Sequence, residues 1–83
     1  MSSALDARTT KLVGVAAAVA AYCQPCFDHH YRKAIEVGAT LDEIRAAVAL
    51  ARAVRAARDG HMDEHVARGM PHEMAPPEPG GTR

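Results

Sequence analysis

The hydrophobic positions near the start of the chain recur with a helical period. Over residues 5–22, the large apolar side chains are three, four or seven positions apart, which predicts an α-helix. Alanine and glycine occupy most positions between them, so neighbouring helices could approach closely. We therefore expect this helix to be buried on nearly all sides. The recurring apolar residues are Leu5, Leu12, Val15, Val19 and Tyr22.

A second helix is predicted to begin near Gln24 and to end at Gly38. Pro25 supports the start, because proline fixes its own φ and lacks an N–H, which suits the first turn of a helix. Gly38 supports the end, because glycine readily takes the positive φ of a C-terminal cap. The apolar pattern continues between these limits as far as Ile35.

Thr40 and Glu43 form the sequence pattern of a capping box, in which each side chain accepts a hydrogen bond from the backbone N–H of the other residue. A third helix is therefore predicted to begin here. Acidic residues in its first turn and arginines near its end match the helix dipole. The predicted core stripe consists of Leu41, Ile44, Val48, Ala51 and Val54.

Asp59 and Gly60 interrupt the helical pattern, and residues 61–68 could form a short fourth helix. From Pro71 onward, the last thirteen residues contain four prolines and two glycines. This composition predicts a disordered tail over residues 71–83. The sequence thus predicts an all-α fold of about four helices, formed by one domain over residues 1–70.

The composition fits a small helical domain that needs a partner. The chain has 83 residues, of which 48% are hydrophobic, and a chain of this length buries too little surface for a large core. We therefore expect a homo-oligomer. Ten basic and ten acidic residues give a formal net charge of zero, which disfavours binding to nucleic acid or to an anionic membrane.

The longest apolar run, residues 12–23, has twelve residues and is too short to cross a bilayer, which takes about 20 residues. A secretory signal is the alternative interpretation of this run. Its alanine-rich composition, and the short chain that cleavage would leave, favour a cytoplasmic protein instead. In the cytoplasm, a C-x-x-C pair is typical of redox or metal chemistry and not of a structural disulfide.

Both cysteines lie in the stretch YCQPCFDHHY, residues 22–31. At a helix start, unpaired N–H groups and the positive end of the dipole favour a thiolate, and the spacing of Cys23 and Cys26 lets one sulfur resolve the oxidised form of the other. His30 follows Cys26 by one helical turn and could move the thiol proton, while His29 could do the same or face solvent. The expected walls of the site are Tyr22, Phe27 and Tyr31.

A metal site is the first alternative. Cys23, Cys26 and a nearby histidine would need a fourth ligand for zinc, which His61 or His65 could supply. These two histidines are four residues apart, and a set formed by them with the nearby His72, Met62, Met70 and Met74 could also hold copper or zinc. They lack the glutamate that follows the first histidine in zinc proteases, which disfavours hydrolytic zinc chemistry. The second alternative is a helical assembly subunit whose cysteines only pack.

Several motifs follow one another in a distinctive order: Thr10-Lys11, an Ala/Val-rich helix, Cys-x-x-Cys-x-x-x-His at residues 23–30, Gly38-Ala39, and a Thr-x-x-Glu-Ile helix start at residues 40–44. This order resembles the carboxymuconolactone decarboxylase and AhpD-like (alkylhydroperoxidase-like) family. The resemblance extends to the C-Q-P-C sequence and a later Met-Asp-Glu at residues 62–64, and it covers about residues 5–68. It implies an all-helical subunit that assembles into trimers or hexamers.

The resemblance also implies roles for the site residues. Cys26 would react with a peroxide or disulfide, Cys23 would donate a proton and resolve the oxidised sulfur, and His30 would belong to a proton relay. A thiol would serve as electron donor, and no cofactor is predicted. The accessory candidates are Lys11, His29, Tyr22 and Tyr31.

Lys11 departs from the family pattern. It stands twelve residues before Cys23, where the family relay has a glutamate. A lysine cannot act as the carboxylate base, although its ammonium would stabilise a thiolate, and Asp28 or Glu36 could replace the missing acid. We predict a thiol–disulfide oxidoreductase with a weakened relay and with alkyl hydroperoxides among its candidate substrates. A decarboxylase-like lyase is the alternative within the family, and the intact C-x-x-C pair disfavours it.

Overall fold

The structure is a computed structural model that describes residues 4–70, and within this range it contains four α-helices and no strand. They are α1 (Ala7–Ala20), α2 (Gln24–Glu36), α3 (Leu41–Ala57) and α4 (Met62–Gly69). The predicted all-α fold, with the C-x-x-C pair at the start of the second helix, is confirmed. The predicted disordered tail lies outside the described residues.

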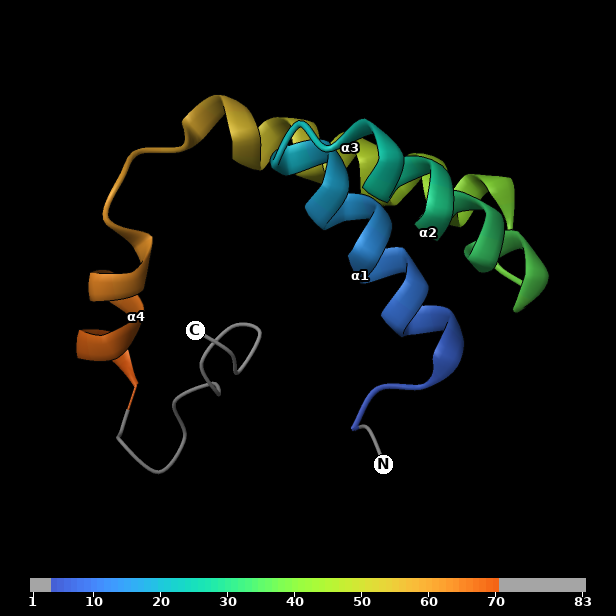
Figure 1. Ribbon diagram of the computed structural model, residues 1–83, viewed down its shortest axis with the longest axis horizontal. Helices are drawn as coiled ribbons and strands as arrows, with labels where there is room; N and C mark the ends of the chain where they lie inside the picture. Colours follow the sequence, from blue (N-terminus) through green and yellow to red (C-terminus); the bar gives the residue numbers. More distant parts are fainter. Residues whose placement is uncertain (1–3, 71–83) are drawn as a thin grey trace.

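The first three helices form one packed group, and α4 stands apart from it (Figure 1). In this group α1 is the central helix, because it packs against both α2 and α3. The segment that leaves α3 carries α4 away from the other helices. None of the helices within residues 4–70 is long and apolar enough to span a membrane.

The core lies where α1, α2 and the beginning of α3 meet. Its buried members are Val15, Ala34, Ala39 and Ile44, and the half-buried side chains of Leu12, Phe27, Tyr31 and Val48 pack against them. Val15 is the only large side chain among the described residues that is fully buried. The core is therefore small, as expected for a chain of this length.

Two predictions about burial are wrong for the single chain. The predicted stripe positions Leu41 and Val54 are exposed, and so are Leu5 and Tyr22, at the two ends of the first stripe. The first helix is also not buried on nearly all sides, because Val13 on α1 is 52% exposed. The physical reason is that, within residues 4–70, α1 makes its main contacts with α2 and α3, which leaves part of its surface uncovered.

The helix ends follow from local hydrogen bonds. Asp6 caps α1 by accepting the Thr9 N–H at 2.7 Å, and this hydrogen bond lowers the pKa of the Asp6 carboxyl. The predicted capping box at α3 is confirmed, since the N–H of Glu43 donates to Thr40 Oγ1 at 3.1 Å and the N–H of Thr40 donates to Glu43 Oε1 at 2.9 Å. Gly38 takes a φ of 94° just after α2, as predicted.

Candidate functional site

A tight turn between α1 and α2 places both cysteines at the start of α2. Helix α1 ends at Ala20, and Tyr22 reverses the chain with a left-handed φ of 58°. The N–H of Cys23 then donates to the Ala18 carbonyl at 3.0 Å, which ties the beginning of α2 to the end of α1. Pro25 occupies the first turn of α2, as the sequence predicted.

Cys23 and Cys26 are joined by a disulfide, with their Cα atoms 5.2 Å apart. Cys23 is the N-cap of α2, and its sulfur accepts the N–H of Cys26 at 3.3 Å. Cys23 is half-buried, whereas Cys26 is exposed. After reduction, the same hydrogen bond and the positive end of the helix dipole would favour a thiolate on Cys23. The exposed Cys26 is the sulfur that an incoming molecule can reach more easily.

His30 lies on the side of α2 that packs against α1. Its ring rests on Gly14, so closely that a Cβ built at Gly14 would come within 2.6 Å of the imidazole Cγ and 2.8 Å of Cε1. The Nδ1 atom of His30 is buried and has no hydrogen-bond partner among the described residues. Glycine at position 14 is therefore what gives the His30 ring its place between the two helices.

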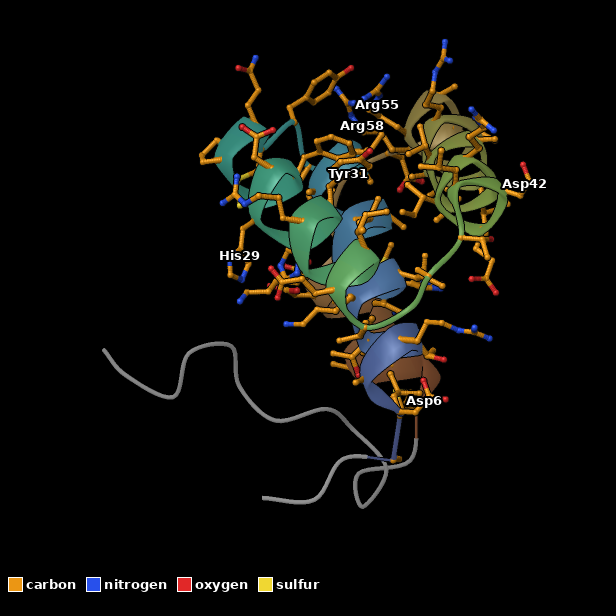
Figure 2. The ribbon with its side chains drawn as sticks, turned by 90° about the vertical axis from the view of Figure 1, so that its right-hand side faces the viewer. Asp6, His29, Tyr31, Asp42, Arg55 and Arg58 are labelled. Carbon is orange, nitrogen blue, oxygen red and sulfur yellow. A yellow bond between two sulfur atoms is a disulfide. The ribbon has the colours of Figure 1, made fainter. Side chains whose placement is uncertain are left out.

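His29 projects from α2 into solvent (Figure 2). Its ring meets that of His30 edge to face, with the centroids 5.0 Å apart. Partial desolvation lowers the pKa of His29 below its usual value, and the positive charges of His30, Lys11, Lys33 and Arg32 lower it further. Lys11 is half-buried on α1, and its charge reaches His29.

Two arginines at the C-terminal end of α3 reach the turn that carries the cysteines: Arg55 lies in the last turn of the helix, and Arg58 is its C-cap. The guanidinium of Arg55 lies 4.4 Å from the centre of the Tyr22 ring, and that of Arg58 lies 5.4 Å from it. Arg55 Nη1 also donates to the Val19 carbonyl at 2.8 Å, at the C-terminal end of α1. A hydrogen bond from Arg58, followed by the charge of Arg55, lowers the pKa of the Tyr22 phenol.

The sequence reasoning missed these arginines as site residues. It assigned the arginines near the end of the third helix to the helix dipole alone. The arginines at positions 52, 55 and 58 are three residues apart, a spacing that places side chains near one face of a helix. This spacing indicates that their side chains could gather into a cluster. The partner of that face could not be known from the sequence, because Val19 and Arg55 are 36 residues apart.

A pocket of about 360 Å³ opens beside the disulfide. Cys23, Tyr22 and Phe27 line it together with Arg55 from α3. The remaining lining residues are Ala18, Val19, Gln24 and Asp28. Of the aromatic walls that the sequence predicted, Tyr22 and Phe27 thus face the pocket, while Tyr31 stacks on Phe27 with the ring centroids 5.6 Å apart.

The family model of the carboxymuconolactone decarboxylase family matches residues 2–70, which include both cysteines and all four helices. The chain belongs to the carboxymuconolactone decarboxylase family. The resemblance stated from the motifs is confirmed. Searches of curated proteins and of solved structures found no significant match. The family includes decarboxylases and alkylhydroperoxidases, so membership is consistent with an enzyme that uses the C-x-x-C pair for redox chemistry.

Within this carboxymuconolactone decarboxylase family domain, the two acids that could replace the missing relay glutamate differ in position. Asp28 lines the pocket beside Cys23. Glu36 lies at the opposite end of α2, where Lys33 Nζ pairs with it at 3.5 Å. Asp28 is therefore the acid that the structure places near the disulfide.

The alternative metal site is not assembled in a single chain. Among residues 4–70, no three His, Cys, Asp or Glu side chains gather into a group that could hold a metal ion. His61 and His65 line a separate hollow of about 370 Å³ with Asp59 and Arg68, away from the cysteines. The structure therefore does not bring the two cysteines together with His61 or His65.

The contact between Gly14 and His30 predicts an unusual response to a Gly14→Ala substitution. In an open helical position this change stabilises a protein by about 1 kcal/mol. Against the His30 ring we expect it to lower the free energy of unfolding by about 1–2 kcal/mol, because the added methyl overpacks the helix contact. In a His30→Ala background the same change should become stabilising.

Chemical denaturation of the four proteins of this double-mutant cycle measures the coupling. Gly69→Ala serves as a control, because a Cβ there meets nothing within 4 Å. Equal effects of Gly14→Ala with and without the His30 ring would show that the ring is not seated on Gly14.

Proposed function

We propose that this protein is a thiol–disulfide oxidoreductase of AhpD-like type, with Cys23 and Cys26 as its redox pair. The observation that supports the proposal most is the disulfide at the start of α2, where the Cys23 sulfur caps the helix and Cys26 is an exposed residue. His30 lies one turn further along the same helix. The proposed substrates are an organic hydroperoxide or a disulfide, and the proposed electron donor is a thiol.

In the reductive half of the reaction, a donor thiolate attacks Cys26 Sγ and breaks the bond between the two cysteines. Cys23 leaves as a thiolate, and its position at the N-cap favours this departure, since a better stabilised thiolate leaves faster. A second donor thiolate attacks the donor sulfur of the mixed disulfide. The donor disulfide is released, and the protein holds two reduced cysteines.

In the oxidative half, the Cys26 thiolate attacks the terminal oxygen of a hydroperoxide and breaks the O–O bond. The alkoxide takes a proton and leaves as an alcohol, and Cys26 becomes a sulfenic acid. Cys23 then attacks the Cys26 sulfur, water leaves, and the disulfide is restored. We assign the proton transfers to the His30 imidazole, because an imidazole can donate and accept protons near neutral pH.

This assignment predicts different behaviour of the two cysteine variants. Cys26→Ser should lower hydroperoxide consumption in the presence of a thiol donor by at least about 100-fold, because the nucleophile is lost. Cys23→Ser should still react once and then retain an oxidised or donor-bound Cys26, detectable by mass spectrometry. Arg45→Gln, on the exposed surface of α3 and away from this pocket, is the control. Full consumption by Cys26→Ser would rule out the mechanism.

Lys11→Glu should increase hydroperoxide turnover by about 10-fold, within the range that a positioned acid–base group contributes. Lys11 lies one turn before Gly14, on which the His30 ring rests, so a carboxylate there could accept a hydrogen bond from the imidazole. Loss of the ammonium should also raise the pKa of His29.

Lys33→Glu is the matched control, because Lys33 also lowers the pKa of His29 but belongs to the surface of α2. Turnover and the histidine titrations, followed by NMR, distinguish the two variants. If both substitutions change turnover equally, position 11 has no special role in the relay.

We also propose that the chain functions as a homo-oligomer, a trimer or a hexamer as the resemblance implies. The support is apolar surface on a protein with a small core: Leu50 is 66% and Val54 is 56% exposed, one turn apart on α3. Val13 adds an exposed apolar side chain on α1.

Leu50→Glu should therefore dissociate the assembly, since it places a charge in an apolar contact. Sedimentation velocity measures the mass, and Arg32→Glu on the exposed surface of α2 provides the control. A wild-type protein that sediments as a monomer at micromolar concentration would contradict the proposal.

A further inference from the structure

Arg52 and Arg55 in the C-terminal half of α3, together with its C-cap residue Arg58, form what we call the arginine cluster. Arg52 and Arg55 line a hollow of about 520 Å³ together with Tyr22. The other lining residues are the alanines of α3 at positions 49, 53 and 56, whose small side chains leave the space open. In Figure 2, Arg55 and Arg58 lie at the end of the molecule where α2 begins, and His29 lies on a different side of α2.

The arginine cluster forms no ion pair within the described part of the chain. The ion pairs among residues 4–70 involve Arg8, Lys33 and Arg45, and none involves the cluster. Because the formal net charge of the whole chain is zero, this is a local concentration of positive charge beside a hollow.

Two of the three guanidinium groups are held in place. Arg55 donates to the Val19 carbonyl at 2.8 Å and lies over the Tyr22 ring, while Arg58 contacts the same ring. Arg52 is exposed on the rim of the hollow. A ligand would therefore meet one fixed guanidinium and one that can move toward it, so little conformational freedom is lost on binding.

The hollow adjoins the pocket beside the disulfide, because Tyr22 and Arg55 line both. A group bound in the hollow would therefore lie next to the pocket that Cys23 lines. Guanidinium groups bind carboxylates through two parallel hydrogen bonds, which makes arginine the residue suited to this anion.

We propose that the hollow between Arg52, Arg55 and Tyr22 is a carboxylate-binding subsite that positions acidic disulfides and thiols against the Cys23–Cys26 pair. The inference rests on the proposed oxidoreductase function and names the substrate class of that site. In the proposed substrates, the carboxylate is a few bonds away from the substrate sulfur that reacts. The same subsite serves both directions of the exchange.

The reaction with an acidic disulfide is balanced within the pair. A thiolate of the reduced pair attacks one substrate sulfur, the substrate S–S bond breaks, and the first substrate thiol leaves. The second cysteine thiolate then attacks the protein sulfur of the mixed disulfide and releases the second substrate thiol. The protein dithiol is oxidised by two electrons, and the disulfide is reduced to two thiols.

The test uses three symmetric disulfides of equal chain length that differ only in their end groups: bis(2-carboxyethyl), bis(2-hydroxyethyl) and bis(2-aminoethyl) disulfide. Pre-reduced protein is mixed with each, and the second-order rate of oxidation of the pair is divided by the rate for dithiothreitol with the same disulfide. We expect the normalised rate to favour the carboxylate over the hydroxyl compound by about 10-fold. The ammonium compound should be slowest.

Arg52→Gln should reduce this carboxylate preference to about 1–3-fold, since one charged donor is lost. Arg45→Gln, on the same helix but paired with Asp42, should retain the full preference. A wild-type protein that reacts with all three disulfides without preferring the carboxylate, or a preference that Arg52→Gln leaves intact, would overturn the subsite while the oxidoreductase function stands.

If none of the disulfides oxidises the pair, the oxidoreductase function itself is refuted. In that case a binding measurement still tests whether the hollow binds a carboxylate. Suberate has the shape of bis(2-carboxyethyl) disulfide with two methylene groups in place of the sulfurs, and 1,8-octanediol is its neutral counterpart. Suberate should shift the NMR signals of the Tyr22 ring in the oxidised protein, with about 10-fold weaker binding to Arg52→Gln, and octanediol should not. Absence of a suberate shift would overturn the subsite.

Discussion

The chemistry of this protein depends on how α1 ends and α2 begins. Tyr22 adopts a left-handed conformation that costs a residue with a side chain roughly 1–2 kcal/mol. The contacts that Arg55 and Arg58 make with its ring offset this cost, and Arg55 also satisfies the Val19 carbonyl at the end of α1. The result is an N-cap at Cys23 and an exposed residue at Cys26, and both features favour a reactive pair of cysteines.

The close packing of α1 against its neighbours also limits the size of the hydrophobic core. Helix α1 is central, and glycine and alanine along it let α2 approach closely, most clearly where the His30 ring meets Gly14. Small residues also leave a core with one large, fully buried side chain in the described part of the chain. Close approach of the helices thus limits the size of the core, and several apolar side chains of α1 and α3 stay exposed in the single chain. The proposed homo-oligomer would bury them.

Much of this architecture followed from local sequence patterns. The capping box of Thr40 and Glu43, the proline after Cys23 and the glycine at position 38 act within a few residues, so they predicted the beginnings and ends of the helices correctly. The burial of Leu41 and Val54 was predicted wrongly, because a helical stripe does not tell which neighbour covers each turn. The arginine contacts with Tyr22 and the seat of His30 on Gly14 depend on helix packing, which no local pattern contains. The roles of His30 and His29 in proton transfer stay predictions.

The most direct measurement is a redox titration of the cysteine pair. The protein is equilibrated in buffers with different ratios of reduced to oxidised dithiothreitol or glutathione, and the free thiols are alkylated and counted by mass spectrometry. The account predicts one reversible two-electron transition between a form with no free thiol and a form with two, with the Cys23–Cys26 disulfide as the only stable oxidised state. Two cysteines that titrate independently, each accumulating a mixed disulfide with glutathione, would contradict it.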